Sequence, residues 1–323
     1  MTQQPETALA PLLLDPQGPT VVAVGGGHGQ AAALEAIQCY AGKITALVSV
    51  GDDGGSSGRL TDLGLPPPGD VRRCLLALTP EPSIWSELFA HRFSGGDVAE
   101  HSLGNLILAG LADLFGDFEA AVSTAERLLG TVGSVLPVAE HPIILKAVID
   151  GVEVVGQRAI SETEGRIEDL TIDPSDAVAT HRALGAVADA DQIVIGPGSL
   201  YTSIISALKV NMLAEAVMSA DAQRVYVMNL VTQMGETMGM DGFAHLTGLS
   251  EHVGIAGPGV VVAHEGPLTV PAGHQRLTID PGEGARYGWR VVFADVCEEQ
   301  ADWPRHDPLK LGRVLEKLAT SKD

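Results

Sequence analysis

Short apolar runs alternate with helix-forming segments along most of the chain, and several of the runs end in glycine. The run at 20–24 is followed by Gly-Gly-Gly-His-Gly-Gln and then by a helix-forming stretch at 31–38. Similar runs at 44–50 and 192–195 lead into Gly-Asp-Asp and Gly-Pro-Gly-Ser. Continuous apolar runs that alternate with helices are typical of buried parallel strands. We therefore predict the α/β class, with a Rossmann-like, doubly wound, mostly parallel sheet.

The periodicity changes between residues 131 and 172. Four short runs there look like strands broken by turn sequences, namely 131–138, 145–149, 153–160 and 166–172. We predict a small antiparallel β insertion around 131–172, packed beside the parallel sheet, as a dimer contact or a lid. It would belong to a single domain over 19–323, preceded by a disordered N-terminal segment at 1–18.

Other segments complete the predicted order of elements. Asp70 follows a stiff Pro-Pro-Pro-Gly turn and is placed as the N-cap of a helix over 71–78. Further helices are predicted at 83–90, 101–115, 117–129, 176–188 and 309–318, and further strands at 224–230, 260–263 and 290–294.

Composition narrows the class of function. The chain has 323 residues and a formal net charge of −21, which repels phosphodiester backbones and argues against a nucleic-acid partner. Its three cysteines form no C-x-x-C pair, so reduced thiols are the simplest account. The first 18 residues lack a basic region before their apolar run, and no run reaches the roughly 18 residues of a membrane span. We expect a cytoplasmic protein without a membrane span.

The two glycine loops are the first candidate ligand sites. Strand, glycine loop and helix in succession form the arrangement in which a helix N-terminus binds phosphate. A bare G-x-G pattern is weak evidence for nucleotide binding. The evidence is stronger here because the next strand ends in Asp52, where a dinucleotide-binding unit carries the acidic residue that binds ribose. The residues concerned are Gly25, Gly26, Gly27, His28 and Gly29 in the first loop, and Gly196, Gly198, Ser199 and Thr202 in the second.

The loop after the second strand is the most unusual stretch. It reads Asp-Asp-Gly-Gly-Ser-Ser-Gly-Arg, and its candidate ligand residues are Asp52, Asp53, Gly54, Gly55, Ser56, Ser57 and Arg59. Glycines allow backbone N–H groups to approach phosphate. The two aspartates could meet ribose hydroxyls or a divalent cation such as Mg²⁺. A flexible turn would leave the aspartate pair and the arginine without a purpose.

Polar residues in helices add further candidates. Arg72 and Arg73 lie in the first turn of their predicted helix, where the helix dipole disfavours a cation, so an anion would be a fitting partner. Either arginine alone could equally be a solvated surface residue. His101 and Asn105 share one face of a mostly apolar helix. A buried asparagine needs a partner, which a ligand or the Asp52 loop would supply. Asp52, Asp53 and His101 are the candidates for catalysis, if any occurs.

Six motifs together resemble the bacterial gluconeogenesis-factor (YvcK) family, which shares a superfamily with 2-phospho-L-lactate transferase (CofD). The motifs follow one another in order over residues 20–318, and they are Gly25-Gly-Gly-x-Gly29, Asp52-Asp-Gly-Gly-Ser-Ser-Gly-Arg-Leu60, Pro67-Pro-Gly-Asp-x-Arg72, His101-Ser-Leu-Gly-Asn-Leu106, Gly196-Pro-Gly-Ser-Leu-Tyr-Thr-Ser203 and Asn229-Leu-x-Thr-Gln-x-Gly-Glu-Thr237. The third motif adds Asp70 to the candidate ligand residues, and the last adds Asn229, Thr232, Gln233 and Glu236.

The resemblance implies a Rossmann-like protein that binds UDP-sugars such as UDP-N-acetylglucosamine. Members of the family support cell shape and peptidoglycan synthesis during growth on gluconeogenic carbon sources. The transferase relatives use Mg²⁺ and acidic residues in the counterpart of the Asp52-Asp53 loop. Two departures stand out, because His28 replaces a usual threonine and Met240-Asp-Gly-Phe-Ala-His245 replaces Tyr-Thr-x-x-Asp-His.

Three functions remain open from the sequence. The first is a nucleotide-sugar-binding regulator, with the diphosphate across both glycine loops and Arg59 or Arg72 on phosphate. The second is a phosphotransferase in which Asp52 and Asp53 hold Mg²⁺ that bridges a diphosphate substrate. The third is an NAD-dependent oxidoreductase, which rests on the glycine loop alone. The protein partner stays unknown, and a homodimer is compatible with the sequence without being required by it.

Overall fold

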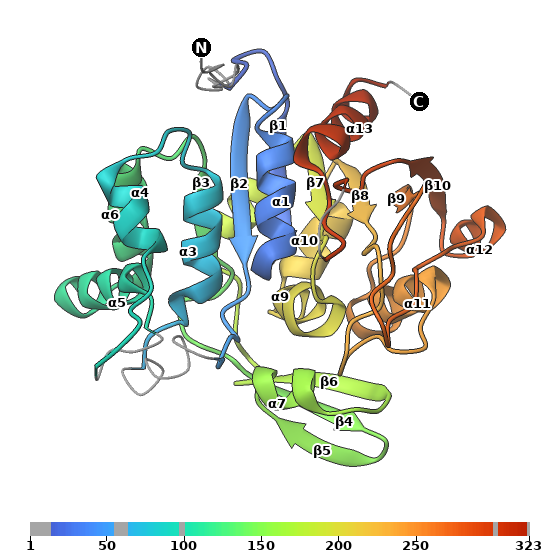
Figure 1. Cartoon of the computed structure of the whole chain (residues 1–323), viewed down its shortest axis with the longest axis horizontal. Coiled ribbons are helices and arrows are strands. Elements are labelled where there is room, and N and C mark those ends of the chain that lie inside the picture. The colour runs from blue at the N-terminus through green and yellow to red at the C-terminus, as the bar shows by residue number, and fades with distance from the viewer. Residues whose placement is uncertain (1–13, 55–63, 97–100, 300–302, 322–323) are drawn as a thin grey trace, which may run out of the picture.

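The computed structural model describes residues 14–54, 64–96, 101–299 and 303–321 (Figure 1). A seven-stranded parallel sheet has the order β10-β9-β8-β7-β1-β2-β3, which confirms the predicted fold class. Its strands are β1 (Thr20–Gly25), β2 (Lys43–Val48), β3 (Ser134–Pro137), β7 (Gln192–Ile195), β8 (Gln223–Val227), β9 (Gly259–His264) and β10 (Trp289–Ala294).

Helices cover both faces of this sheet, because alternate residues of each strand point to opposite sides. On β1, Val21 and Ala23 join one apolar cluster while Val22 and Val24 join the other. The first cluster contains residues of α1 (Gly27–Ile37), α3 (Pro68–Ala77), α5 (Leu103–Phe115), α6 (Phe118–Leu129) and α13 (Pro308–Thr320). The second contains residues of α8 (His181–Ala188), η2 (Leu200–Ile205), α9 (Ser206–Leu208), α10 (Leu213–Ser219) and α11 (Gly242–Val253).

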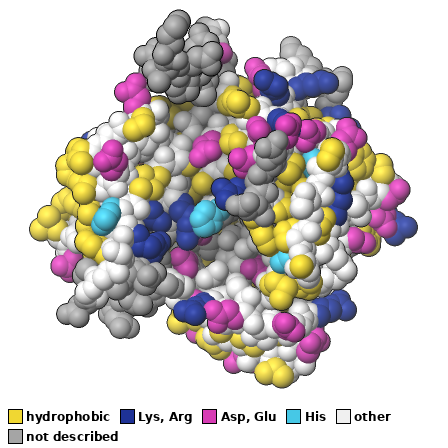
Figure 2. All heavy atoms as spheres, viewed as in Figure 1, with side chains coloured by type: hydrophobic (Ala, Val, Ile, Leu, Met, Phe, Trp, Pro, Cys, Tyr) yellow, Lys and Arg dark blue, Asp and Glu magenta, His cyan; other side chains and the backbone are white. Residues whose placement is uncertain are grey.

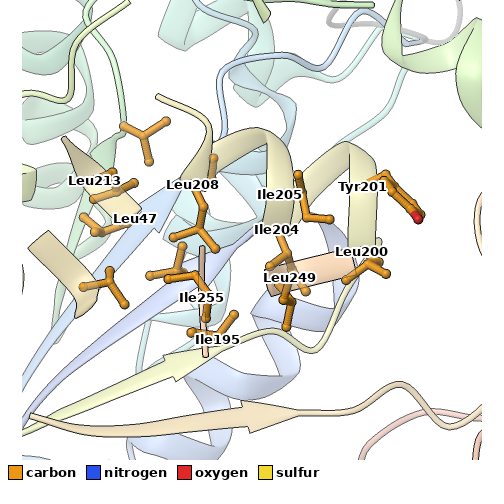
Figure 3. Packing of buried hydrophobic residues seen from close by; sticks show 14 of the residues in the cluster. Leu47, Ile195, Leu200, Tyr201, Ile204, Ile205, Leu208, Leu213, Leu249 and Ile255 are labelled. Atoms are coloured by element: carbon orange, nitrogen blue, oxygen red, sulfur yellow. The ribbon is translucent and has the colours of Figure 1, made fainter. Parts of the chain in front are cut away.

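The segment after β7 begins as a π-helix, η2, and continues into α9. Figure 3 shows Ile204 and Leu208 on the side of this segment that faces Ile195 of β7, while Tyr201 points away from that strand. Both Ile204 and Leu208 are almost fully buried. This packing fixes where the helical segment starts, and hence where the second glycine loop lies.

A smaller sheet lies beside the main one. It has the order β5-β4-β6, formed antiparallel by β4 (Ile144–Ile149), β5 (Val152–Val155) and β6 (Ile167–Asp173). The predicted strand at 131–138 does not belong to it, because β3 pairs in parallel with β2 at the edge of the main sheet. The predicted strand at 153–160 is also too long, since Gly156 ends it and α7 (Gln157–Glu162) follows.

The remaining helices are α4 (Ile84–Ala90) and α12 (Pro281–Arg286). Two local predictions fail at helix starts. The helix predicted from residue 176 begins only at His181, where Thr180 caps it. Asp70 is not an N-cap, because α3 already starts at Pro68, with proline in the first turn. The Asp70 carboxylate is directed to another helix instead.

The chain order places a topological switch between β1 and β7. From β1 the chain proceeds to β2 on one side, whereas β7 leads to β8 on the other. In open α/β sheets, ligands bind at such a point, outside the carboxyl ends of the strands. The loops after β1 and β7 are the two glycine loops predicted from the sequence.

Candidate functional site

Two cavities meet where the glycine loops face each other. A cleft of about 850 Å³ is lined by Gly26 to Gly29, by Pro197 to Ser199 and by residues after β8 and before α13. A polar cavity of about 150 Å³ lies next to it. Gly27, His28 and Ser199 line both cavities. A ligand with two dissimilar ends, joined at the N-terminus of α1, would fit this arrangement.

The first turn of α1 is fastened to α3. Asp70 accepts a hydrogen bond from the backbone N–H of Gly27 at 2.9 Å and pairs with Arg73. The N–H groups in the first turn of a helix have no partner within the helix, and those of His28 and Gly29 belong to this turn. Burial raises the pKa of Asp70, against the lowering effect of Arg73. Asp70 therefore holds the first turn of α1 against α3, and it also lines the smaller cavity.

Cationic groups gather around this turn although the chain is strongly acidic. Burial lowers the pKa of His28, and the charges of Arg73, Arg305 and Arg72 lower it further. Figure 2 shows Lys and Arg side chains beside a histidine near the centre of this face. A local positive field at a helix N-terminus favours an anion.

The sequence points to Arg73 together with Arg72, but it does not single out Arg305. Arg73 lines the smaller cavity and Arg305 lines the cleft. Arg72, which we expected at phosphate, is buried, and its Nε donates to Asn105 at 3.0 Å while a terminal nitrogen donates to the Phe89 carbonyl. Asn105 thus finds its partner inside the protein. His101 lines neither cavity.

The two adjacent aspartates have different surroundings. Asp52 lines the smaller cavity. Asp53 instead accepts the N–H of Arg158 at 2.8 Å, in the first turn of α7, so it joins the central loop to the antiparallel insertion. The remaining candidates of this loop, Gly55, Ser56, Ser57 and Arg59, lie outside the described residues, whereas the backbone N–H of Gly54 donates to Asp52.

The donors around Asp52 bear on the Mg²⁺ prediction. Within the described residues, no group of three histidines, cysteines or carboxylates is placed to hold a metal ion. Mg²⁺ commonly takes one or two carboxylates together with substrate phosphates and waters. Asp52, with the hydroxyls of Ser49, Thr202 and Ser203 in the same cavity, fits that limited role. Asp53 does not line this cavity, and one of its oxygens already accepts the Arg158 N–H.

Separate roles for the two aspartates predict separate phenotypes. We expect Asp53→Ala to lower the free energy of unfolding by about 1 kcal/mol, the usual value of a lost helix cap, with ligand affinity little changed. Asp52→Ala should weaken ligand binding and cost less stability than Asp53→Ala, because the hydrogen bond it loses is a local one from Gly54. Denaturant unfolding and calorimetric titration of both variants check this, and equal effects of the two changes on both properties would contradict the assignment.

The polar residues after β8 mainly build the second glycine loop. Asn229 accepts the Gly198 N–H at 3.1 Å and donates to the Gly198 carbonyl at 2.8 Å. Gln233 donates to the Ser199 hydroxyl at 3.3 Å. Thr232 is fully buried and accepts the N–H of Gln275. Asn229 and Gln233 also line the cleft, so they can contact a ligand, whereas Thr232 is a structural residue.

Glu236 stabilises the start of η2. Its carboxylate accepts the N–H groups of Tyr201 and Thr202, at 3.1 and 3.2 Å, and the Thr202 hydroxyl at 2.6 Å. The Ser161 hydroxyl of α7 donates to it as well, at 3.3 Å. Both Glu236 and Thr202 are buried, and Glu236 lines neither cavity.

The far wall of the cleft comes from the C-terminal part of the chain, which the sequence did not predict. It is lined by Trp303 to His306 and by Pro308. His306 holds this segment against the end of β8, with Nε2 3.2 Å from the Met228 carbonyl oxygen, and burial lowers the pKa of His306 to about 4. The departure at residues 240–245 does not line either cavity.

Comparisons with known proteins bear on the family of this chain. A family model described as 2-phospho-L-lactate transferase CofD matches residues 21–296. The gluconeogenesis factor of Bacillus subtilis (strain 168) is 42% identical over 312 residues, which covers 94% of this chain and 98% of the relative. The chain belongs to the gluconeogenesis-factor family. The resemblance found in the sequence motifs is thereby confirmed.

Two further relatives support the same placement within the gluconeogenesis-factor family. The gluconeogenesis factor of Halalkalibacterium halodurans is 40% identical over 305 residues, covering 91% of this chain and 95% of that protein. A crystal structure of a UPF0052 family member from Bacillus halodurans superimposes with a TM-score of 0.88 at 35% identity, covering 93% of this chain and 99% of that chain. No helix in the described part of the chain is long and apolar enough to cross a membrane.

Proposed function

We propose that this member of the gluconeogenesis-factor family is a regulator that binds a nucleotide sugar of the UDP-N-acetylglucosamine type. In this role it would support cell shape and peptidoglycan synthesis during growth on gluconeogenic carbon sources. The observation that carries the proposal is the junction of the large cleft with the small polar cavity at the N-terminus of α1. A nucleoside and a sugar, joined by a diphosphate, have the shape and charge that such a junction favours.

The chemistry of each part supports this ligand class. The diphosphate would lie at the first turn of α1, where the charges of Arg73 and Arg305 already act on His28. The smaller cavity offers hydroxyls and carboxylates, including Ser49, Asp52 and Ser203, which suit sugar hydroxyls. A nucleoside diphosphate without a sugar would reach the junction with its phosphates but would leave the smaller cavity to water, so a nucleotide sugar fits both cavities better.

Calorimetric titration of UDP-N-acetylglucosamine, with and without Mg²⁺, tests the proposal. We expect saturable binding that persists when Mg²⁺ is chelated, because protein cations and a helix N-terminus already neutralise the diphosphate. The ligand should be recovered intact from the mixture afterwards. If the folded wild-type protein does not bind UDP-N-acetylglucosamine, the proposal is wrong.

A phosphotransferase is the second candidate, favoured by the position of Asp52 in the smaller cavity and by the family match to CofD. In that case Mg²⁺ would be held by Asp52 and ligand phosphates, and catalysis would come from positioning and charge neutralisation. The same titration would then show Mg²⁺-dependent binding and consumption of the nucleotide in the presence of an acceptor, both lost in Asp52→Asn.

A further inference from the structure

The large cleft has a cationic end and an acidic end along α1. His28, Ala31, Ala32 and Glu35 all line it, so one face of the helix forms its wall. His28 and Glu35 are seven residues apart, which is about 10 Å along the helix axis. The His28 end lies in the field of Arg73 and Arg305. The other end is acidic, because Glu298 also lines the cleft. Burial raises the pKa of Glu35, and the negative charge of Glu298 raises it further.

An aromatic side chain lines the same cleft as this face of α1. Trp303 lines the cleft and remains 42% exposed. Its ring meets that of His274 edge-on, with centroids 4.8 Å apart and an interplanar angle of 89°. His274 is held in turn by the Thr232 carbonyl oxygen, 2.7 Å from its Nδ1. The indole is therefore supported by a fixed neighbour and keeps surface available for a flat ligand group.

We infer that the nucleoside of the ligand occupies the large cleft, with its base stacked on Trp303 and its hydroxyl or N–H donors directed to Glu35 and Glu298. This inference rests on the proposed function and adds the orientation of the ligand. The diphosphate lies at the cationic end, because phosphate would be repelled by the two carboxylates. The group beyond the diphosphate then enters the smaller cavity. Stacking on an indole tolerates every base, so the carboxylates contribute the selectivity for donors.

Truncation of the indole tests the stacking. UDP and inorganic pyrophosphate are titrated into the wild type, Trp303→Ala and Trp303→Phe, after denaturant unfolding has shown each variant to be folded. We expect Trp303→Ala to weaken UDP binding by between about fivefold and a hundredfold, the range for loss of a base-stacking aromatic, and to leave pyrophosphate binding unchanged. Trp303→Phe should restore most of the affinity.

Trp85 provides a matched control. It is 39% exposed, close to the value for Trp303, and it lies on α4 and lines neither cavity. Trp85→Ala should bind UDP as the wild type does. If Trp303→Ala binds UDP with wild-type affinity, or loses UDP and pyrophosphate binding equally, the inference is wrong. Failure of the wild type to bind any UDP ligand would instead defeat the proposed function itself.

Glu35→Gln tests the orientation. With the nucleoside beside Glu35, replacing a charged acceptor by a neutral one should weaken UDP binding about fivefold without affecting pyrophosphate. With the opposite orientation, the nucleoside would enter the smaller cavity and the phosphates would stay at the first turn of α1, so Glu35→Gln should leave UDP binding unchanged or tighten it slightly by removing a distant negative charge. Unchanged or tighter UDP binding by Glu35→Gln therefore overturns the inferred orientation.

Discussion

Gly29→Ala is expected to lower the affinity for UDP-N-acetylglucosamine at least tenfold and the free energy of unfolding by about 1–3 kcal/mol. A Cβ at this position would lie 2.5 Å from the Pro197 carbonyl oxygen and 2.9 Å from Gly198 Cα. Both contacts are to backbone, so no side chain can rotate away. The first turn of α1 and the loop after β7 would have to separate, and these are the two walls at which the cavities join.

The control is a glycine in a helix with free space around it. Gly110, in α5, has no heavy atom within 4 Å of the site of an added Cβ, and it lines neither cavity. Gly110→Ala should keep ligand affinity and gain roughly 0.5–1 kcal/mol of stability, since alanine restricts the unfolded chain. Calorimetric titration and denaturant unfolding measure both effects. Wild-type affinity in Gly29→Ala would show that contact between the loops is not required for binding.

The architecture was predictable because the buried parallel strands read as continuous apolar runs. The runs at 20–24 and 192–195 became β1 and β7, and the glycines after them marked the loops at the switch point. The strand at 131–138 was misplaced because an edge strand and an inserted strand have the same β-branched composition. Its pairing with β2 is a contact across more than 80 residues, which local pattern does not contain.

The candidate site was predictable in its loops and less so in its side chains. Arg72 and Arg73 are adjacent, and sequence alone does not tell which of them turns toward the cavity. Asp52 and Asp53 pose the same problem, and the structure assigns one to the cavity and one to α7. Trp303 and Arg305 could not have been found from motif spacing, because chain folding alone brings them to α1.

Glu236 shows why a polar residue in a ligand motif can have a structural role. The sequence places it in a loop near the sheet edge, where a carboxylate could bind a ligand. The structure turns it inward, where it accepts hydrogen bonds from η2 and from Ser161 of α7. It therefore joins the main sheet, η2 and the insertion. Gly235 fits this packing, since an added Cβ would lie 2.0 Å from the Ser161 carbonyl oxygen.

Glu236→Ala is expected to lower the free energy of unfolding by about 3 kcal/mol or more, because it leaves buried donors without an acceptor. The donors are the N–H groups of Tyr201 and Thr202 and the hydroxyls of Thr202 and Ser161. Glu236→Gln should cost only about 1 kcal/mol. Its amide oxygen can accept both N–H groups, while its NH₂ can donate to the two hydroxyl oxygens.

The stability difference between the wild type and Glu236→Gln should depend on pH. Burial raises the pKa of Glu236 above its ordinary value, although the hydrogen bonds from Thr202, Tyr201 and Ser161 lower it. The folded state thus binds the Glu236 proton more tightly than the unfolded state does. The free energy of unfolding gained from this proton is fully present below the ordinary glutamate pKa of about 4.3, and it is lost as pH rises through the folded pKa. Denaturant unfolding from acidic to neutral pH should show Glu236→Gln gaining on the wild type as pH increases. A stability difference that stays constant with pH would mean that Glu236 titrates alike in both states and that its hydrogen bonds fully offset its burial.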